Sequence, residues 1–128
     1  MQDKTVQKIS RRLKAIGDPT RIKIITLLSQ RPCCVCELAQ ILGLAQPTIS
    51  RHLKQLETEG FISGKREKSW IIYSLTPQEE CCKQLLEILV GRARKDKEVM
   101  GLLQKLDGVQ RPEPVEPLEA VLPGGQKQ

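Results

Sequence analysis

The sequence is poor in aromatic residues and in histidine. Its 128 residues include one Trp, one Tyr, one Phe and one His. A core with so few aromatic side chains must be built from Leu, Ile and Val, which favours a helical fold. The single histidine, His52, has no matching nucleophile, and the chain lacks a glycine-rich phosphate loop. These absences argue against an enzyme.

Long apolar runs are also missing. No segment approaches the roughly 18 apolar residues of a membrane span, and the polar segment 1–8 does not resemble a signal peptide. We therefore expect a cytoplasmic protein with neither a membrane nor a small organic substrate as its partner. The chain has five cysteines, an odd number. In a reducing compartment such cysteines are expected to be free or bound to metal rather than paired in disulfides.

The chain is basic and has the length of one domain. Lys and Arg number 21 against 15 Asp and Glu, a net charge of +6. This charge makes a polyanion such as nucleic acid a plausible partner. Beyond Gly108, prolines alternate with glutamates, a composition typical of disorder. We predict a folded domain over residues 1–108 and a disordered tail over 109–128.

Apolar residues spaced three and four apart predict four helices in the first half of the chain, over about residues 4–16, 19–30, 35–42 and 46–60. The last two are joined by a short turn that contains Gly43. Two helices connected in this way are typical of a helix-turn-helix, in which the second helix reads the DNA.

The predicted reading helix is amphipathic. Its apolar residues are Ile49, Leu53 and Leu56, spaced for one helical face. The opposite face holds cationic and hydrogen-bonding residues, among them Ser50, Arg51 and Lys54. This face is the predicted DNA-binding surface.

After Gly60 the pattern becomes extended and then helical again. β-forming residues in 61–63 and 70–75 predict a hairpin, and its charged tip, 65–69, suits a wing that lies along phosphates. Helical periodicity returns after Pro77, and segment 99–106 can extend this helical region. The stripe within 85–90 is too apolar for a solvated helix. It can form either part of the core or a dimer interface, and we favour the dimer interface.

Four motifs together resemble the ArsR/SmtB family of winged-helix repressors. They are the run 18–22 (Asp-Pro-Thr-Arg-Ile), the box 34–38 (Cys-Val-Cys-Glu-Leu), the segment 46–53 and the hairpin end 72–75. The resemblance implies a homodimeric winged helix-turn-helix, mainly α with a β-hairpin wing, that binds double-stranded operator DNA. It also implies DNA-contacting residues in the recognition helix and the wing: Gln46, Thr48, Ser50, Arg51, His52 and Arg66.

The Cys-Val-Cys box resembles that of the arsenite and cadmium/lead sensing members of this family. Cys34 and Cys36 are the implied thiolate ligands. Where arsenic sensors often have a further cysteine, this chain has Ala39, which leaves Cys33, Cys81 or Cys82 as the third ligand. Thiolates without imidazole favour soft centres such as As(III), Sb(III), Cd(II) or Pb(II) over structural zinc.

The spacing of the two cysteines predicts how binding of an ion is sensed. Residues i and i+2 of an α-helix point about 200° apart. We therefore expect that Cys34 and Cys36 bind one ion only if the first turn of their helix unwinds, which would disturb the reading helix and release the operator. An alternative is a repressor of the same fold whose thiols respond to oxidants or persulfides.

Overall fold

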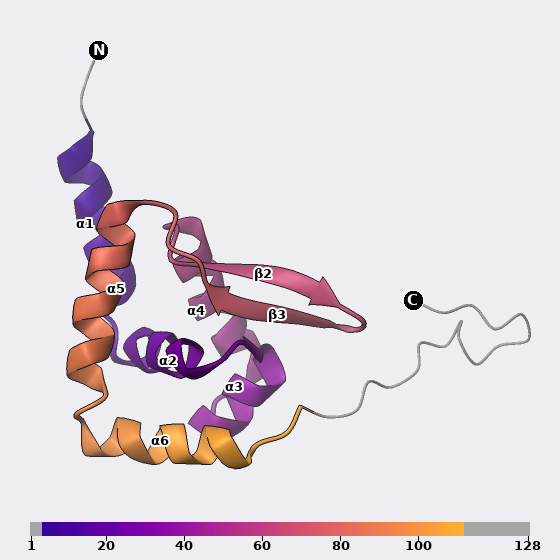
Figure 1. Ribbon diagram of the computed structural model, residues 1–128. Coiled ribbons are helices and arrows are strands. Elements are labelled where there is room, and N and C mark those ends of the chain that lie inside the picture. Colours follow the sequence, from indigo (N-terminus) through magenta and orange to yellow (C-terminus); the bar gives the residue numbers. More distant parts are fainter. Residues whose placement is uncertain (1–3, 112–128) are drawn as a thin grey trace, which may run out of the picture.

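The computed structural model describes residues 4–111, which form six α-helices and three β-strands (Figure 1). In chain order these are α1 (Thr5–Ile16), α2 (Pro19–Gln30), β1 (Cys33–Cys34), α3 (Val35–Leu42), α4 (Gln46–Thr58), β2 (Ile62–Glu67), β3 (Trp70–Leu75), α5 (Glu80–Ala93) and α6 (Lys97–Gly108).

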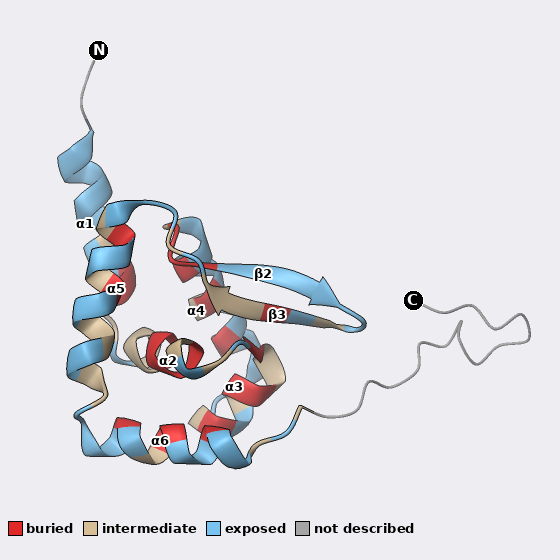
Figure 2. Ribbon diagram, viewed as in Figure 1, coloured by how far each residue is buried: buried red, intermediate tan, exposed pale blue. Residues whose placement is uncertain are grey.

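Helix α2 is the centre of the core. It begins at Pro19, which has no N–H to leave unsatisfied, and the Asp18 side chain caps it by accepting a hydrogen bond from the Arg21 N–H at 3.0 Å. Its residues Ile24 to Leu28 are buried, and it contacts α1, α4, α5, α6 and β3. Figure 2 shows buried residues on the inner faces of the surrounding helices. The expected aliphatic core is therefore present.

Helices α3 and α4 form the predicted helix-turn-helix. Gly43 ends α3 in the left-handed conformation (φ 68°), and its N–H donates to the Ala39 carbonyl. This conformation favours glycine, because a side chain there would clash with the backbone. The chain then turns within three residues into α4, whose apolar residues Ile49, Leu53 and Leu56 are completely buried.

The three strands form one antiparallel sheet in the order β1-β3-β2. The β2–β3 hairpin projects from the helices as a wing (Figure 1), and Lys68 at its turn has a positive φ of 56°. The expected fold class, mainly helical with a β-hairpin wing, is confirmed. Strand β1 was not predicted: it pairs Cys33 with Tyr73 and Cys34 with Ile72, so it attaches the cysteine box to the wing.

The last two helices are separate. Residues 94–96 interrupt them, and the Asp96 side chain caps α6 by accepting from the Val99 N–H at 3.1 Å. Within residues 4–111, no helix is both long and apolar enough to span a membrane.

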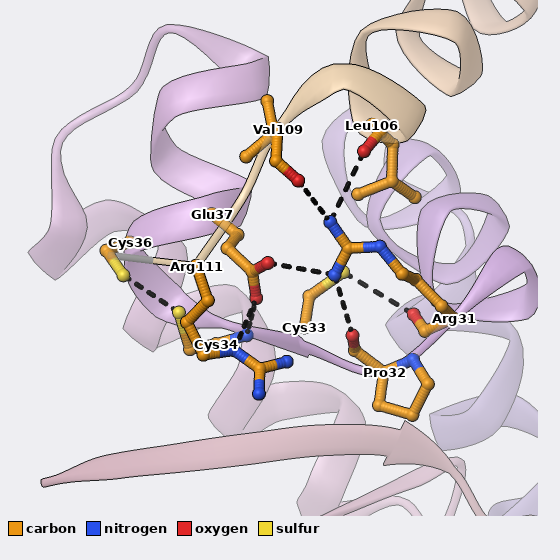
Figure 3. Close-up of polar contacts among 9 residues, drawn as sticks. All are labelled: Arg31, Pro32, Cys33, Cys34, Cys36, Glu37, Leu106, Val109 and Arg111. Carbon is orange, nitrogen blue, oxygen red and sulfur yellow. Dashed lines mark hydrogen bonds and ion pairs between the residues drawn. The ribbon is translucent and has the colours of Figure 1, made fainter. Parts of the chain in front are cut away.

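Glu37 is the only charged residue among the described ones that is buried, with 1% of its side chain exposed. Its Oε1 accepts from the Cys34 N–H at 2.9 Å and from Arg111 Nε at 3.2 Å, and its Oε2 accepts from Arg31 Nη1 at 2.8 Å (Figure 3). The first of these bonds is half of a capping box at the N-terminus of α3. Burial alone would raise the pKa of Glu37, but hydrogen bonds from Cys34 and Arg31 and the charge of Arg31 outweigh it and hold the pKa below its ordinary value.

The segment after α6 is part of this cluster. Arg31 Nη2 donates to the carbonyls of Leu106 at 3.3 Å and Val109 at 3.0 Å, and Arg111 reaches Glu37. Residues 109–111, which composition assigned to the tail, thus make arginine contacts with the domain that composition does not reveal. The rest of the predicted tail, 112–128, lies outside the described residues.

Replacing Glu37 should destabilise the fold strongly. Glu37→Ala removes the partner of two arginines and one helix cap, and we expect a loss of about 3 kcal/mol in the free energy of unfolding. Urea denaturation followed by circular dichroism measures it. The matched control is Glu57→Ala on the exposed face of α4, which should change stability by less than about 0.5 kcal/mol. A similarly small effect of Glu37→Ala would show that the cluster does not stabilise the protein.

Candidate functional site

The predicted DNA-binding residues lie along one side of α4 and on the wing. Gln46, Ser50, Arg51 and Lys54 are exposed, whereas Thr48 and His52 are half-buried. Arg66 is exposed on β2. The fold thus presents a polar, cationic surface on the helix that follows the turn. Such a surface is suited to the major groove, with a charged wing beside it.

His52 has a partner inside the protein. Arg21 Nη1 lies 3.2 Å from His52 Nδ1. A guanidinium can only donate hydrogen bonds, so Nδ1 is the acceptor and the ring proton lies on Nε2. Burial and the charges of Arg21 and Arg51 lower the pKa of His52, although Asp18 opposes them. His52 is therefore a neutral donor through Nε2 at neutral pH. Nothing in the sequence pattern indicated this contact of Arg21, which lies in the family motif 18–22.

The two cysteines of the Cys-Val-Cys box meet at the start of α3. The Sγ atoms of Cys34 and Cys36 are 2.8 Å apart (Figure 3). Cys34 is the N-cap residue, with extended backbone angles (φ −89°, ψ 169°), and Cys36 lies in the first helical turn. The structure thus brings together the two principal predicted ligands.

This geometry overturns the expectation that chelation must unwind α3. The argument applied helical geometry to both residues, yet Cys34 precedes the first helical residue, Val35. Extended backbone at the cap turns the Cys34 side chain back towards Cys36. An ion can therefore reach both sulfur atoms while the helix stays intact.

The two sulfur atoms are closer together than two ligands of one tetrahedral thiophilic ion, so the pair would have to open to hold such an ion. Two sulfur atoms bound to one such centre through bonds of about 2.3 Å are about 3.8 Å apart. The Cys34 and Cys36 sulfur atoms, now 2.8 Å apart, would have to separate by only about 1 Å.

The three other predicted ligands lie apart from this pair. Cys33 points away from Cys34, because successive strand residues point to opposite faces of a sheet. It is buried, and its Sγ donates to the Arg31 carbonyl at 3.4 Å. Cys82 is buried and donates to the Glu59 carbonyl at 3.8 Å, and Cys81 is half-buried beside Arg12. Within residues 4–111, no three His, Cys, Asp or Glu side chains are grouped closely enough to hold a metal ion. The third ligand stays a prediction.

Burial acts on two of the cysteine thiols before α3. Burial, and to a lesser extent the hydrogen bond with Cys36, raise the pKa of Cys34 to about 12. Burial also raises the pKa of Cys33 to about 11. A buried thiol with a raised pKa is a poor nucleophile. This environment therefore disfavours the oxidant-sensing alternative at Cys33 and Cys34.

Two further residues border the site and were not predicted as functional. Arg31 and Arg111 both contact Glu37, which binds the Cys34 N–H. Arg111 lay in the predicted tail, and nothing in its local sequence indicates a contact 74 residues away. Glu37 is the third member of this cluster. It lies three residues after the N-cap, Cys34, which is the spacing of a capping box, and this spacing was the one sequence signal for the cluster.

Comparison with known proteins agrees with this architecture. Residues 18–63 match the profile described as "Bacterial regulatory protein, arsR family". The arsenic resistance transcriptional regulator ArsR1 of Pseudomonas putida is 41% identical over 66 residues, which cover 51% of this chain and 52% of that protein. The chain thus spans about half the length of that relative.

Two other similar proteins extend the comparison. An uncharacterized HTH-type transcriptional regulator of Methanocaldococcus jannaschii, MJ1325, is 33% identical over 84 residues, 65% of this chain and 92% of that protein. The crystal structure of the transcriptional repressor BigR from Xylella fastidiosa superposes with a TM-score of 0.61 at 28% identity, covering 73% of this chain and 93% of that one. These relatives are transcriptional regulators and not enzymes. The chain belongs to the arsR family of bacterial regulatory proteins, as its four motifs, its winged helix-turn-helix and these matches establish.

Proposed function

We propose that this protein is a transcriptional repressor that binds operator DNA as a homodimer and releases it when As(III) or a similar thiophilic ion binds Cys34 and Cys36. The observation that carries this proposal is the 2.8 Å approach of the two sulfur atoms at the start of α3. That helix positions α4, the predicted reading helix. A named regulator of arsenic resistance among the relatives supports the choice of ion.

For the DNA-bound state, we propose that α4 lies in the major groove with Gln46, Ser50, Arg51 and Lys54 towards the bases and phosphates. These side chains are exposed, and the opposite face of α4 is buried in the core. Arg66 on the exposed β2 would contact the backbone beside the groove. The neutral His52 would donate through Nε2.

Arg51→Ala should weaken operator binding. Loss of an arginine that contacts DNA is expected to cost about 1 to 3 kcal/mol, or roughly 5- to 150-fold in affinity, with a shallower salt dependence. Fluorescence anisotropy with labelled operator DNA at several salt concentrations measures both. Lys83→Ala on the exposed surface of α5 removes the same charge away from α4 and serves as the control. If both variants bind alike, Arg51 is not a DNA contact.

We propose that the dimer forms through the terminal helices α1 and α5. Helix α1 exposes an apolar stripe, with Val6 75%, Ile9 37% and Leu13 48% exposed, and these residues line a groove. On α5, Ile88 is 67% exposed. Arg12 of α1 hydrogen-bonds to Glu79 at the start of α5, which joins the two helices. Apolar side chains exposed in this number are typical of an interface.

Leu13→Glu should dissociate the dimer. A charge buried in an apolar interface has no partner, so we expect dimerisation at least about 100-fold weaker. Sedimentation velocity at several protein concentrations gives the monomer fraction. Gln7→Glu introduces the same charge at an exposed residue of α1 that does not line the groove, and it should leave the dimer intact. A stable Leu13→Glu dimer would place the interface elsewhere.

We propose two routes by which the ion would weaken DNA binding. Separation of the sulfur atoms displaces Cys34, which pairs with Ile72 of β3 and so with the wing. It also displaces the N-terminus of α3, which packs against α4. A coupling free energy of about 1 to 3 kcal/mol through either route would reduce operator affinity roughly 5- to 150-fold.

Replacement of either thiol should abolish release while leaving DNA affinity unchanged. Under reducing conditions, arsenite is expected to release the wild-type protein from its operator, and Cys34→Ser or Cys36→Ser should stay bound. The same titration with Cys33→Ser, Cys81→Ser and Cys82→Ser identifies the third ligand as the one whose loss weakens the response. Release by a persulfide donor or an oxidant, with no response to arsenite, would instead establish the redox alternative.

A further inference from the structure

The segment after α6 connects the cysteine box to the wing. Val109 is held through its carbonyl by Arg31 Nη2, and two residues later Arg111 Nε donates to Glu37 Oε1 at 3.2 Å (Figure 3). The guanidinium carbon of Arg111 is also 5.8 Å from the centroid of the Trp70 ring. A cation at this distance from an aromatic face is attracted to it. Arg111 therefore contacts both the buried carboxylate and the wing.

Trp70 lies near the end of the wing. It pairs with Glu67 in the last register position before the Lys68–Ser69 turn. Trp70 is half-buried, and the Arg111 guanidinium lies over its ring. The contact thus restrains the part of the hairpin that lies farthest from the core.

The carboxylate that binds Arg111 is also hydrogen-bonded to the backbone of Cys34. Glu37 Oε1 accepts from both the Cys34 N–H at 2.9 Å and Arg111 Nε at 3.2 Å. Cys34 Sγ is one of the two sulfur atoms that an ion would separate. A shift of the Cys34 backbone therefore changes its hydrogen bond to Glu37 Oε1, the same oxygen that binds Arg111.

We propose that Arg111 is a positioning residue that transmits occupancy of the thiol pair to the wing through Glu37 and Trp70. Without an ion, the Glu37–Arg111–Trp70 contacts hold the wing in its DNA-binding position. An ion at Cys34 and Cys36 displaces Glu37, Arg111 leaves the Trp70 ring, and the wing is released. This inference rests on the proposed function, and it assigns a regulatory role to the segment 109–111.

The tryptophan provides a direct readout, since Trp70 is the only tryptophan in the chain. Sodium arsenite, added under reducing conditions, should change the Trp70 emission of the wild-type protein. In Arg111→Ala the emission of the free protein should already differ, and arsenite should change it little. Gln110→Ala, an exposed neighbour in the same segment, should respond as the wild type does.

The functional measurement is the ratio of operator affinities without and with arsenite. A ratio cancels the general effect of removing a positive charge. Arg111→Ala should reduce this ratio by about fivefold or more, Trp70→Leu should do the same, and the double variant should lose no more than either alone. Ultraviolet absorption of the arsenic–thiolate bonds should show that both variants still bind arsenite.

The two proposals fail in distinguishable ways. If arsenite releases the wild-type protein and Arg111→Ala keeps the full ratio and the emission change, transmission through Arg111 is wrong while ion sensing stands. Unequal or additive effects of Arg111→Ala and Trp70→Leu would equally overturn the shared path. If the wild-type protein binds arsenite but keeps its operator, the repressor proposal itself fails, and the Arg111 proposal fails with it.

Discussion

The buried carboxylate of Glu37 is the interaction on which the arrangement of the site depends. It lies in the core with 1% of its side chain exposed, and three donors from the C-cap of α2, the N-cap of α3 and the segment after α6 satisfy it. An unpaired charge at this depth would be very unfavourable, so each donor is held in place by the need to satisfy it. The start of α3, and with it the two cysteines, is therefore positioned from three directions.

The thiol pair consequently lies at a junction rather than on a flexible loop. Cys34 belongs to β1, which pairs with the wing, and it also caps α3, which packs against α4. Packed elements of this kind respond to a displacement of about 1 Å by changing their contacts, because interiors have little free volume. A small chemical event at the sulfur atoms is thereby connected to both parts of the fold that are suited to DNA. An ion that binds Cys34 must displace the proton of a buried thiol, since the thiolate is the metal ligand.

Much of the fold could be predicted because its signals are local. Helices α2 and α3 follow the apolar periodicity, with Pro19 and Gly43 marking a start and an end, and the wing follows its β-forming residues. Strand β1 was missed because two residues are too few for any period, and because its pairing with β3 joins residues about 40 positions apart. The role of Arg111 was missed for a related reason, since proline-rich composition nearby suggested disorder.

The sequence by itself determined the helix-turn-helix, the wing and the family, and it predicted the two principal cysteines. Spacing, capping and motif signals are encoded within short stretches of chain, and these were sufficient. Only the tertiary structure decided how the cysteines meet, which groups surround them and what connects them to the wing. These features depend on the backbone angles of one cap residue and on contacts between distant segments, and a linear pattern carries neither.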